Sequence, residues 1–102
     1  MIRQELILQD AIRHYGKEHQ LNVAIEKMSE LIKEICKYKR YYVNRKEITE
    51  EMADVYVMLW QMELIFANTD EVCKVMNEKI RRLNERLKNE QDGINATVNQ
   101  SI

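Results

Sequence analysis

The sequence predicts an all-α protein, an antiparallel bundle of about four helices. The 102 residues include no proline and only two glycines, so few residues interrupt a helix. Met, Leu, Ile, Glu and Lys are abundant, and this mixture favours helix over strand. Apolar residues recur at three- and four-residue steps along most of the chain, which is the period of an α-helix.

The first two helices are predicted on either side of Gly16, because glycine readily ends a helix. The first covers about residues 3–15 and has one apolar side. That side is formed by Leu6, Ile7, Ala11 and Ile12. The second covers about residues 17–40 and has a wider apolar face. Its members are Leu21, Ala24, Ile25, Met28, Leu31, Ile32 and Ile35.

The third helix is predicted to begin at Asn44. Glu47 follows three residues later, and this pair resembles a capping box, in which the two side chains bond to free backbone N–H groups. The helix then continues to about Ala67. Its predicted core stripe consists of Ile48, Met52, Val55, Leu59, Met62 and Phe66.

A fourth helix is predicted after the polar run 68–71, which breaks the third helix and caps the next one. Its apolar row consists of Val72, Met76, Ile80, Leu83 and Leu87. The periodicity is lost after Asn89, and the remaining sequence is polar. We therefore expect one helical domain over residues 1–90 and a mobile polar tail over residues 91–102.

The third helix carries a second apolar face, away from the predicted core stripe. This face is formed by Ala53, Val57, Trp60 and Leu64. A chain of 102 residues has little else with which to cover it. We therefore expect the bundle to be completed by homodimerisation or by formation of a homotetramer.

Composition excludes several classes of protein. The net charge of −1 argues against a general nucleic-acid binder, and no segment approaches the ~20 apolar residues of a membrane span. Cys36 and Cys73 lack the close spacing of a redox pair or zinc knuckle, and two cysteines do not make a disulfide scaffold. These features are typical of a soluble cytoplasmic protein.

Acidic residues on two helices indicate a candidate metal site. Asp54 is the only charged residue between Met52 and Gln61, and an ionised group removed from water needs a partner. Glu51 lies one turn earlier on the same stripe. The second helix offers further carboxylates at Glu26, Glu30 and Glu34. Two such helices facing each other could hold a divalent cation.

The same acidic residues also fit a plain surface. On the second helix, Glu30 and Glu34 can be solvated charges paired with Lys33 and Lys37. Asp54 is harder to explain in this way, because its neighbours along the chain are apolar. The metal-site hypothesis therefore depends most on the third helix.

The run from Gln20 to about Leu87 resembles the MazG-like all-α nucleoside triphosphate pyrophosphohydrolases, and most of all their small phage-type members. The similar pieces are QLNVAIEKMSELIKEICKYKR, EEMADVYVML and KIRRLNER. The family pattern is Glu-Glu-x-x-Glu on one helix and Glu-x-x-Asp on the next, which together bind Mg²⁺. Such enzymes hydrolyse nucleoside or deoxynucleoside triphosphates to the monophosphate and pyrophosphate.

Carried over by position, the resemblance implies both a metal site and a substrate site. The implied metal ligands are Glu26, Glu30, Glu51 and Asp54, of which Glu30, Glu51 and Asp54 are also the implied catalytic residues. Mg²⁺ is the implied cofactor, and Mn²⁺ is expected to substitute. A triphosphate also needs basic contacts. The candidates are Lys37, Lys39, Arg40, Lys79, Arg82 and Arg86, whose alternative role is a solvated charged face.

Lys27 departs from the family pattern, because the family has a glutamate ligand at this position. An ammonium group removes an oxygen donor and repels a metal ion. Three outcomes stay open: Glu26 or Glu34 replaces the ligand, Lys27 swings away, or the chain is a degenerate homologue. The alternative of a different class is a non-catalytic helical module that binds nucleotide weakly or serves in a protein assembly.

Overall fold

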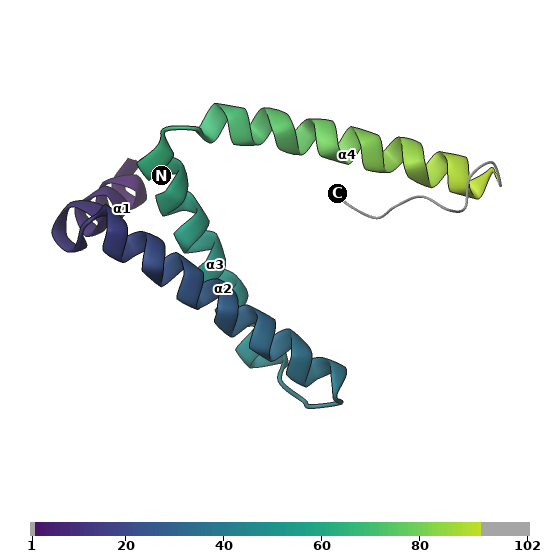
Figure 1. Ribbon diagram of the computed structural model, residues 1–102, viewed down its shortest axis with the longest axis horizontal. Helices are drawn as coiled ribbons and strands as arrows, with labels where there is room; N and C mark the ends of the chain where they lie inside the picture. Colours follow the sequence, from purple (N-terminus) through teal and green to yellow (C-terminus); the bar gives the residue numbers. More distant parts are fainter. Residues whose placement is uncertain (1, 93–102) are drawn as a thin grey trace. The chain divides into compact units, whose positions relative to one another are not determined.

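The computed structural model describes residues 2–92, and within them the chain is entirely helical, without a strand (Figure 1). The four helices are α1 (Ile2–Tyr15), α2 (Lys17–Lys39), α3 (Arg45–Phe66) and α4 (Thr69–Gln91). The all-α prediction is confirmed, and each helix was predicted within about two residues of its bounds. None of the helices in this part of the chain is long and apolar enough to cross a bilayer.

The chain divides into two compact units, Met1–Ala67 and Asn68–Ile102, and each unit is described here by itself. The expectation of one domain over residues 1–90 therefore stays a prediction. The expected polar tail lies outside the described residues, except that α4 continues to Gln91 and Asp92 forms its C-cap.

Gly16 forms the joint between α1 and α2, as its position in the sequence predicted. Its φ of 95° lies in the region that side chains with a Cβ disfavour. Its N–H donates to the carbonyl of Ile12 at 2.9 Å and so closes the last turn of α1. The chain can therefore turn sharply and start α2 at once.

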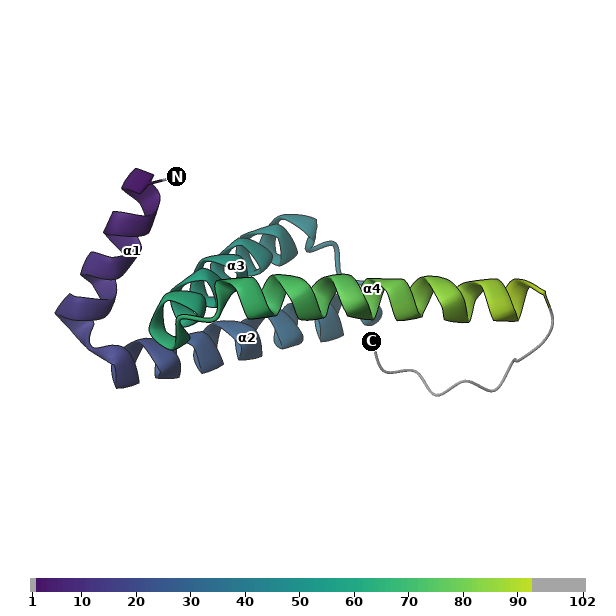
Figure 2. The same cartoon turned by 90° about the horizontal axis from the view of Figure 1, so that it is seen from above.

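The first unit is built around α2 and α3, which lie side by side and run in opposite directions (Figures 1 and 2). The helix α1 contacts both. Among the described residues, the only buried hydrophobic side chains are Ala24 and Met58. The other buried side chains are polar or charged: Gln20, Glu34, Asn44 and Gln61. The seam of this helix pair is therefore unusually polar.

The predicted core stripe of the third helix is wrong at several positions. Met52, Leu59 and Phe66 are exposed, and the buried side chains of α3 are Met58 and Gln61. On α2 the buried positions also differ from the predicted apolar face. Ala24 is buried, whereas Ile25, Ile32 and Ile35 are exposed. The helices have turned polar positions towards each other, because those positions form bonds across the seam.

One such bond joins two buried glutamines. Gln20 Nε2 donates to Gln61 Oε1 at 2.8 Å, and Gln61 Nε2 lies 3.6 Å from the sulfur of Met58. The Nδ1 atom of His19 lies 2.8 Å from Gln20 Oε1. A buried amide that loses its partner is costly, so this network fixes how α2 and α3 are aligned along their length.

Asn44 closes the other end of the pair, but not as a capping box. It is the N-cap of α3, as predicted, yet its side chain makes no capping bond. Instead, Asn44 Nδ2 donates to the carbonyl oxygen of Glu34 at 2.9 Å and to Glu34 Oε1 at 2.8 Å. The predicted capping box is therefore wrong: the amide N–H group of Asn44 donates to Glu34, and its Oδ1 atom, the acceptor that a capping box needs, has no hydrogen-bond partner among the described residues. The amide ties the start of α3 to the end of α2.

The Asn44 contact also predicts a pH dependence of stability. The hydrogen bond from Asn44, followed by the charge of Lys37, holds the pKa of Glu34 below its ordinary value of 4.5. Because the pKa is lowered in the folded state, this stabilisation is complete above pH 4.5 and is lost as the pH falls through the lower folded pKa. We expect Asn44→Ala to lower the free energy of unfolding at pH 7 by about 1–3 kcal/mol.

Thermal melting between pH 7 and pH 3 tests this expectation. The difference between native protein and Asn44→Ala should narrow in acid. The matched control is Asn68→Ala, since Asn68 is the N-cap of α4 and its side chain also makes no capping bond. Equal losses in both variants at every pH would show that the contact with Glu34 contributes nothing specific.

The second unit contains α4. Ala67 is the C-cap of α3 and has a left-handed conformation (φ 52°), and α4 begins after it, at the predicted break. None of the side chains of α4 is buried. Of its predicted apolar row, Met76, Ile80 and Leu87 are exposed. Arg81 bonds to Glu78 and to Glu85 on the exposed side of the helix. The helix is thus amphipathic, and Arg81 is paired with two glutamates along its surface.

Candidate functional site

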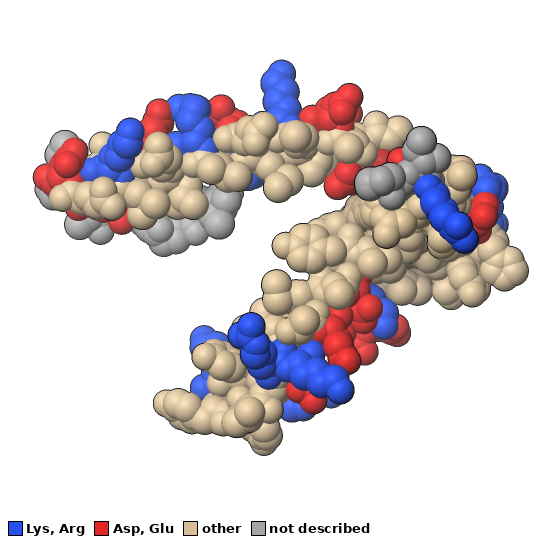
Figure 3. Space-filling model, turned by 180° about the vertical axis from the view of Figure 1, so that it is seen from behind, with Lys and Arg blue, Asp and Glu red and all other residues tan. Residues whose placement is uncertain are grey.

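The α2–α3 pair brings a lysine into contact with acidic residues of both helices. Lys27 Nζ lies 3.4 Å from Glu30 Oε1 on α2 and 3.6 Å from Asp54 Oδ2 on α3. The first contact spans one helical turn and the second crosses the seam. Figure 3 shows acidic and basic side chains gathered together over this part of the first unit. The ammonium group therefore joins two carboxylates from different helices.

Asp54 is not removed from water, contrary to what its apolar neighbours suggested. Its side chain is 47% exposed and faces Lys27. The flanking Met52 and Tyr56 are exposed as well. The expectation failed because α3 buries other positions against α2, which leaves Asp54 at the edge of the seam. Its partner is an ammonium group of the protein itself.

Glu51 has an enclosed carboxylate oxygen without a hydrogen bond, and so does Glu30, whose Oε1 atom faces Lys27. Glu51 is half-buried, and its Oε1 atom is enclosed without a hydrogen-bond donor among the described residues. Loss of hydration raises the pKa of Glu51, and the negative charges of Glu30 and Asp54 raise it further. The charge of Lys27 acts in the opposite direction but is the weaker effect. This carboxylate therefore needs more positive charge than Lys27 supplies.

The same environment favours the charged form of Lys27. Its pKa is raised, first by the charge of Glu30 and then by that of Asp54, so the ammonium stays protonated. Glu26 adds a smaller effect from an exposed position. We call Lys27, Glu30, Glu51 and Asp54 the lysine–carboxylate cluster. Glu26, the remaining implied ligand, lies at its margin.

The donor chemistry of the cluster fits a divalent ion, but its present arrangement does not. Mg²⁺ prefers carboxylate oxygens, and the cluster contains three carboxylates, of which Glu30 and Glu51 each have an enclosed oxygen without a hydrogen bond. A positive group already lies among them, the ammonium of Lys27. Within residues 2–92, no three His, Cys, Asp or Glu side chains are grouped closely enough to hold a metal. The carboxylates are arranged around a lysine.

The predicted phosphate-binding residues fall into two groups. Lys37 and Arg40 both lie over the ring of Tyr42, 5.9 Å from its centroid, and Lys37 Nζ is 3.6 Å from Glu34 Oε2. Lys39 is exposed beside them at the end of α2. The second group belongs to α4 in the other unit. It consists of Lys79, Arg82 and Arg86. Only the first group therefore belongs to the same unit as the cluster.

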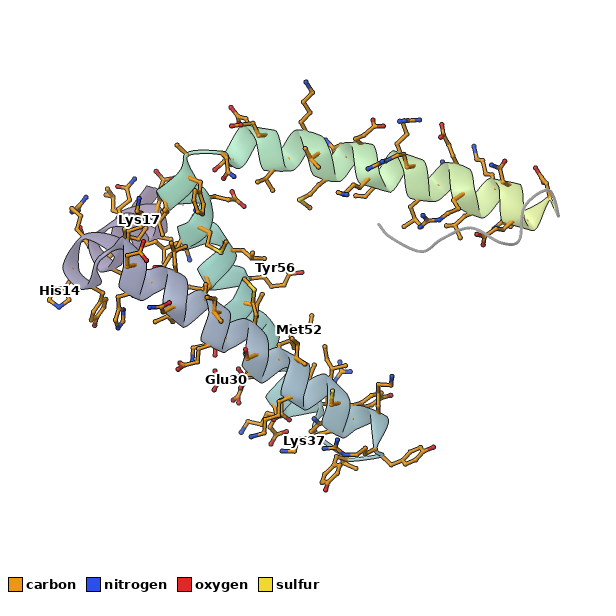
Figure 4. All side chains as sticks on the ribbon, in the orientation of Figure 1. His14, Lys17, Glu30, Lys37, Met52 and Tyr56 are labelled. Atoms are coloured by element: carbon orange, nitrogen blue, oxygen red, sulfur yellow. The ribbon has the colours of Figure 1, made fainter. Side chains whose placement is uncertain are left out.

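A shallow groove, which we did not predict from the sequence, lies on the α2–α3 pair. Its volume is about 700 Å³. It is lined by Tyr38, Arg45, Ile48, Thr49, Met52, Ala53 and Tyr56. Met52 and Tyr56 project to one side of the helix pair and Glu30 to the other (Figure 4). The spacing of Ile48, Met52 and Tyr56 could have indicated one side of this groove. Tyr38 joins them only when α2 and α3 are packed together.

Comparison of the chain with protein-family models, curated proteins and solved structures finds no match.

Proposed function

We propose that this chain is a Mg²⁺-dependent hydrolase that cleaves nucleoside or deoxynucleoside triphosphates to the monophosphate and pyrophosphate. The observation that carries the proposal is the meeting of Glu30 on α2 with Asp54 on α3 through one cation, Lys27. The resemblance to MazG-like enzymes supplies the reaction class. The acidic motifs that carry this resemblance lie on these two helices.

The carboxylates act as metal ligands in this proposal. Glu30, Glu51 and Asp54 would hold the metal ion, with Glu26 as a further ligand at the margin. Mg²⁺, when bound, supplies charge neutralisation on the phosphates and an activated water. The Oε1 atom of Glu51 has no hydrogen-bond donor among the described residues, so it would be available to the metal ion as a ligand.

The basic residues at the end of α2 support binding of a polyphosphate. Lys37, Lys39 and Arg40 place positive charge in the same unit as the cluster. Contacts of this kind are charge-assisted and therefore strong. Lys79, Arg82 and Arg86 of α4 belong to the other unit, and their role in phosphate binding stays a prediction.

We also propose that the protein is a homodimer or homotetramer. The first unit buries only two hydrophobic side chains among its described residues, whereas many large apolar ones are exposed on α2 and α3. A core this small stabilises a fold poorly, and exposed apolar surface of this extent is typical of an interface.

Product analysis tests the proposed reaction. Purified protein with Mg²⁺ and a panel of ribo- and deoxyribonucleoside triphosphates should release equal amounts of monophosphate and pyrophosphate. Chelation of the metal should abolish this release. Glu51→Gln should reduce it by roughly a hundredfold, because the metal site loses a charged ligand. The neighbouring exposed Glu50 provides the control Glu50→Gln, which should retain activity.

A second candidate is a non-catalytic helical module. It is favoured by the position of Lys27 Nζ, which stands among the carboxylates where a metal ion would bind. In that case no nucleotide of the panel would be turned over at any metal concentration. Equal rates in native protein and Glu51→Gln would likewise contradict the hydrolase.

A further inference from the structure

We propose that Lys27 is an internal counter-ion that competes with divalent metal for Glu30 and Asp54, so that metal enters only when the lysine leaves. This inference deepens the proposed function, because it concerns regulation of the same site. It rests on that function for the identity of the competing ion.

The first argument is geometric. The ammonium nitrogen lies 3.4 Å from one carboxylate oxygen and 3.6 Å from the other. A Mg²⁺ ion requires its oxygens at about 2.0–2.1 Å. The same two oxygens cannot satisfy both cations at once, since the ammonium would then lie almost against the ion. Lysine and metal therefore exclude each other.

The second argument concerns Glu51. Its Oε1 atom lies in the cluster without a hydrogen bond, so Lys27 does not neutralise all of the negative charge of the cluster. A divalent ion carries twice the charge of an ammonium group, and it could take this third oxygen as well once the side chains draw together, because they are not grouped closely enough in the present arrangement. Replacing lysine by metal thus gains a contact that the lysine does not make.

The third argument is that Lys27 is able to leave. Its side chain is 31% exposed, and those of Glu30 and Asp54 are 44% and 47% exposed. Lysine has a flexible four-carbon stem, and its ion pairs in partly exposed positions are weak. Lys27 can therefore turn into water without disturbing the helices. When metal is absent, it replaces the ion and joins α2 to α3.

The test compares two lysines of the same helix. Lys27→Met removes the ammonium from the cluster, whereas Lys33→Met removes an exposed one whose charge acts on Glu34 instead. Binding of Mn²⁺ is measured by the loss of its free electron-paramagnetic-resonance signal, without nucleotide. Lys27→Met should bind Mn²⁺ about tenfold more tightly than native protein, because one repelling charge is gone. Lys33→Met should bind as native protein does.

Thermal melting provides the second readout. With chelator present, Lys27→Met should melt below Lys33→Met, since its three carboxylates have lost their cation. Mn²⁺ should raise the melting temperature of Lys27→Met more than that of native protein. Equal Mn²⁺ affinity in native protein and Lys27→Met, or no binding to either, would overturn the inference.

The two proposals fail separately. Tighter Mn²⁺ binding by Lys27→Met without any pyrophosphate release would leave the competition standing and remove the hydrolase. Pyrophosphate release by native protein, with equal Mn²⁺ affinity in native protein and Lys27→Met, would support the hydrolase and contradict the competition.

Discussion

Lys27→Glu should raise the Mg²⁺-dependent release of pyrophosphate by roughly tenfold or more over native protein at limiting metal, as a change in metal affinity of that size would. The substitution removes the ammonium group that bridges Glu30 and Asp54 and places a carboxylate in the same turn. It also restores the Glu-Glu-x-x-Glu pattern on α2. Initial rates at matched Mg²⁺ concentrations measure the gain.

Lys27→Gln separates the two effects of that substitution. It removes the positive charge without adding a carboxylate, so its rate should lie between those of native protein and Lys27→Glu. If native protein already turns over briskly and Lys27→Glu gives no gain in rate or metal affinity, Lys27 does not compete with the metal. The missing ligand would then be Glu26 or Glu34.

The helices themselves could be predicted because their signals are local. Gly16 has a positive φ that favours glycine, and the polar run after Ala67 breaks the periodicity. These signals act within a few residues and need no knowledge of the rest of the fold. The helix bounds therefore agree closely with the structure.

The buried face of α3 could not be predicted in the same way. Apolar residues lie on nearly every side of this helix, so periodicity could not decide between its faces. The structure buries Gln61, which bonds to Gln20 of α2 across the seam. This pairing joins residues 41 positions apart in the sequence. Only the packing of the two helices reveals it.

The candidate site was predicted in part, and for a physical reason. Positions three residues apart share a helix face, so Glu51 was expected beside Asp54. Which residues meet across the seam depends on the rotation of both helices. That rotation leaves Asp54 half exposed and in contact with Lys27, and it leaves Glu51 with an unpaired oxygen.

Asn44 shows the same limit at a helix end. Its residue type and position correctly indicated the start of α3. An asparagine amide can accept or donate, however, and the sequence does not say which. In the structure, the amide N–H group of Asn44 donates to Glu34, which lies ten residues earlier on another helix.

Tyr56→Glu should dissociate the protein into subunits. Tyr56 is 68% exposed in the single chain and lines the groove beside Met52 and Tyr38. At such an exposed position on a monomer, the substitution would change stability by no more than about 0.5 kcal/mol. In an interface it would bury an unpaired charge. The dissociation constant should then rise by roughly a hundredfold or more.

Sedimentation equilibrium over a dilution series measures this effect, and the melting temperature of native protein should rise with concentration. Tyr41→Glu is the matched control, since Tyr41 is 94% exposed in the loop between α2 and α3 and receives the same new charge. It should assemble as native protein does. A native protein that stays a 12.3 kDa monomer at every concentration would contradict the proposed assembly. So would equal dissociation of both variants, because the cause would then be net charge rather than the face around Tyr56.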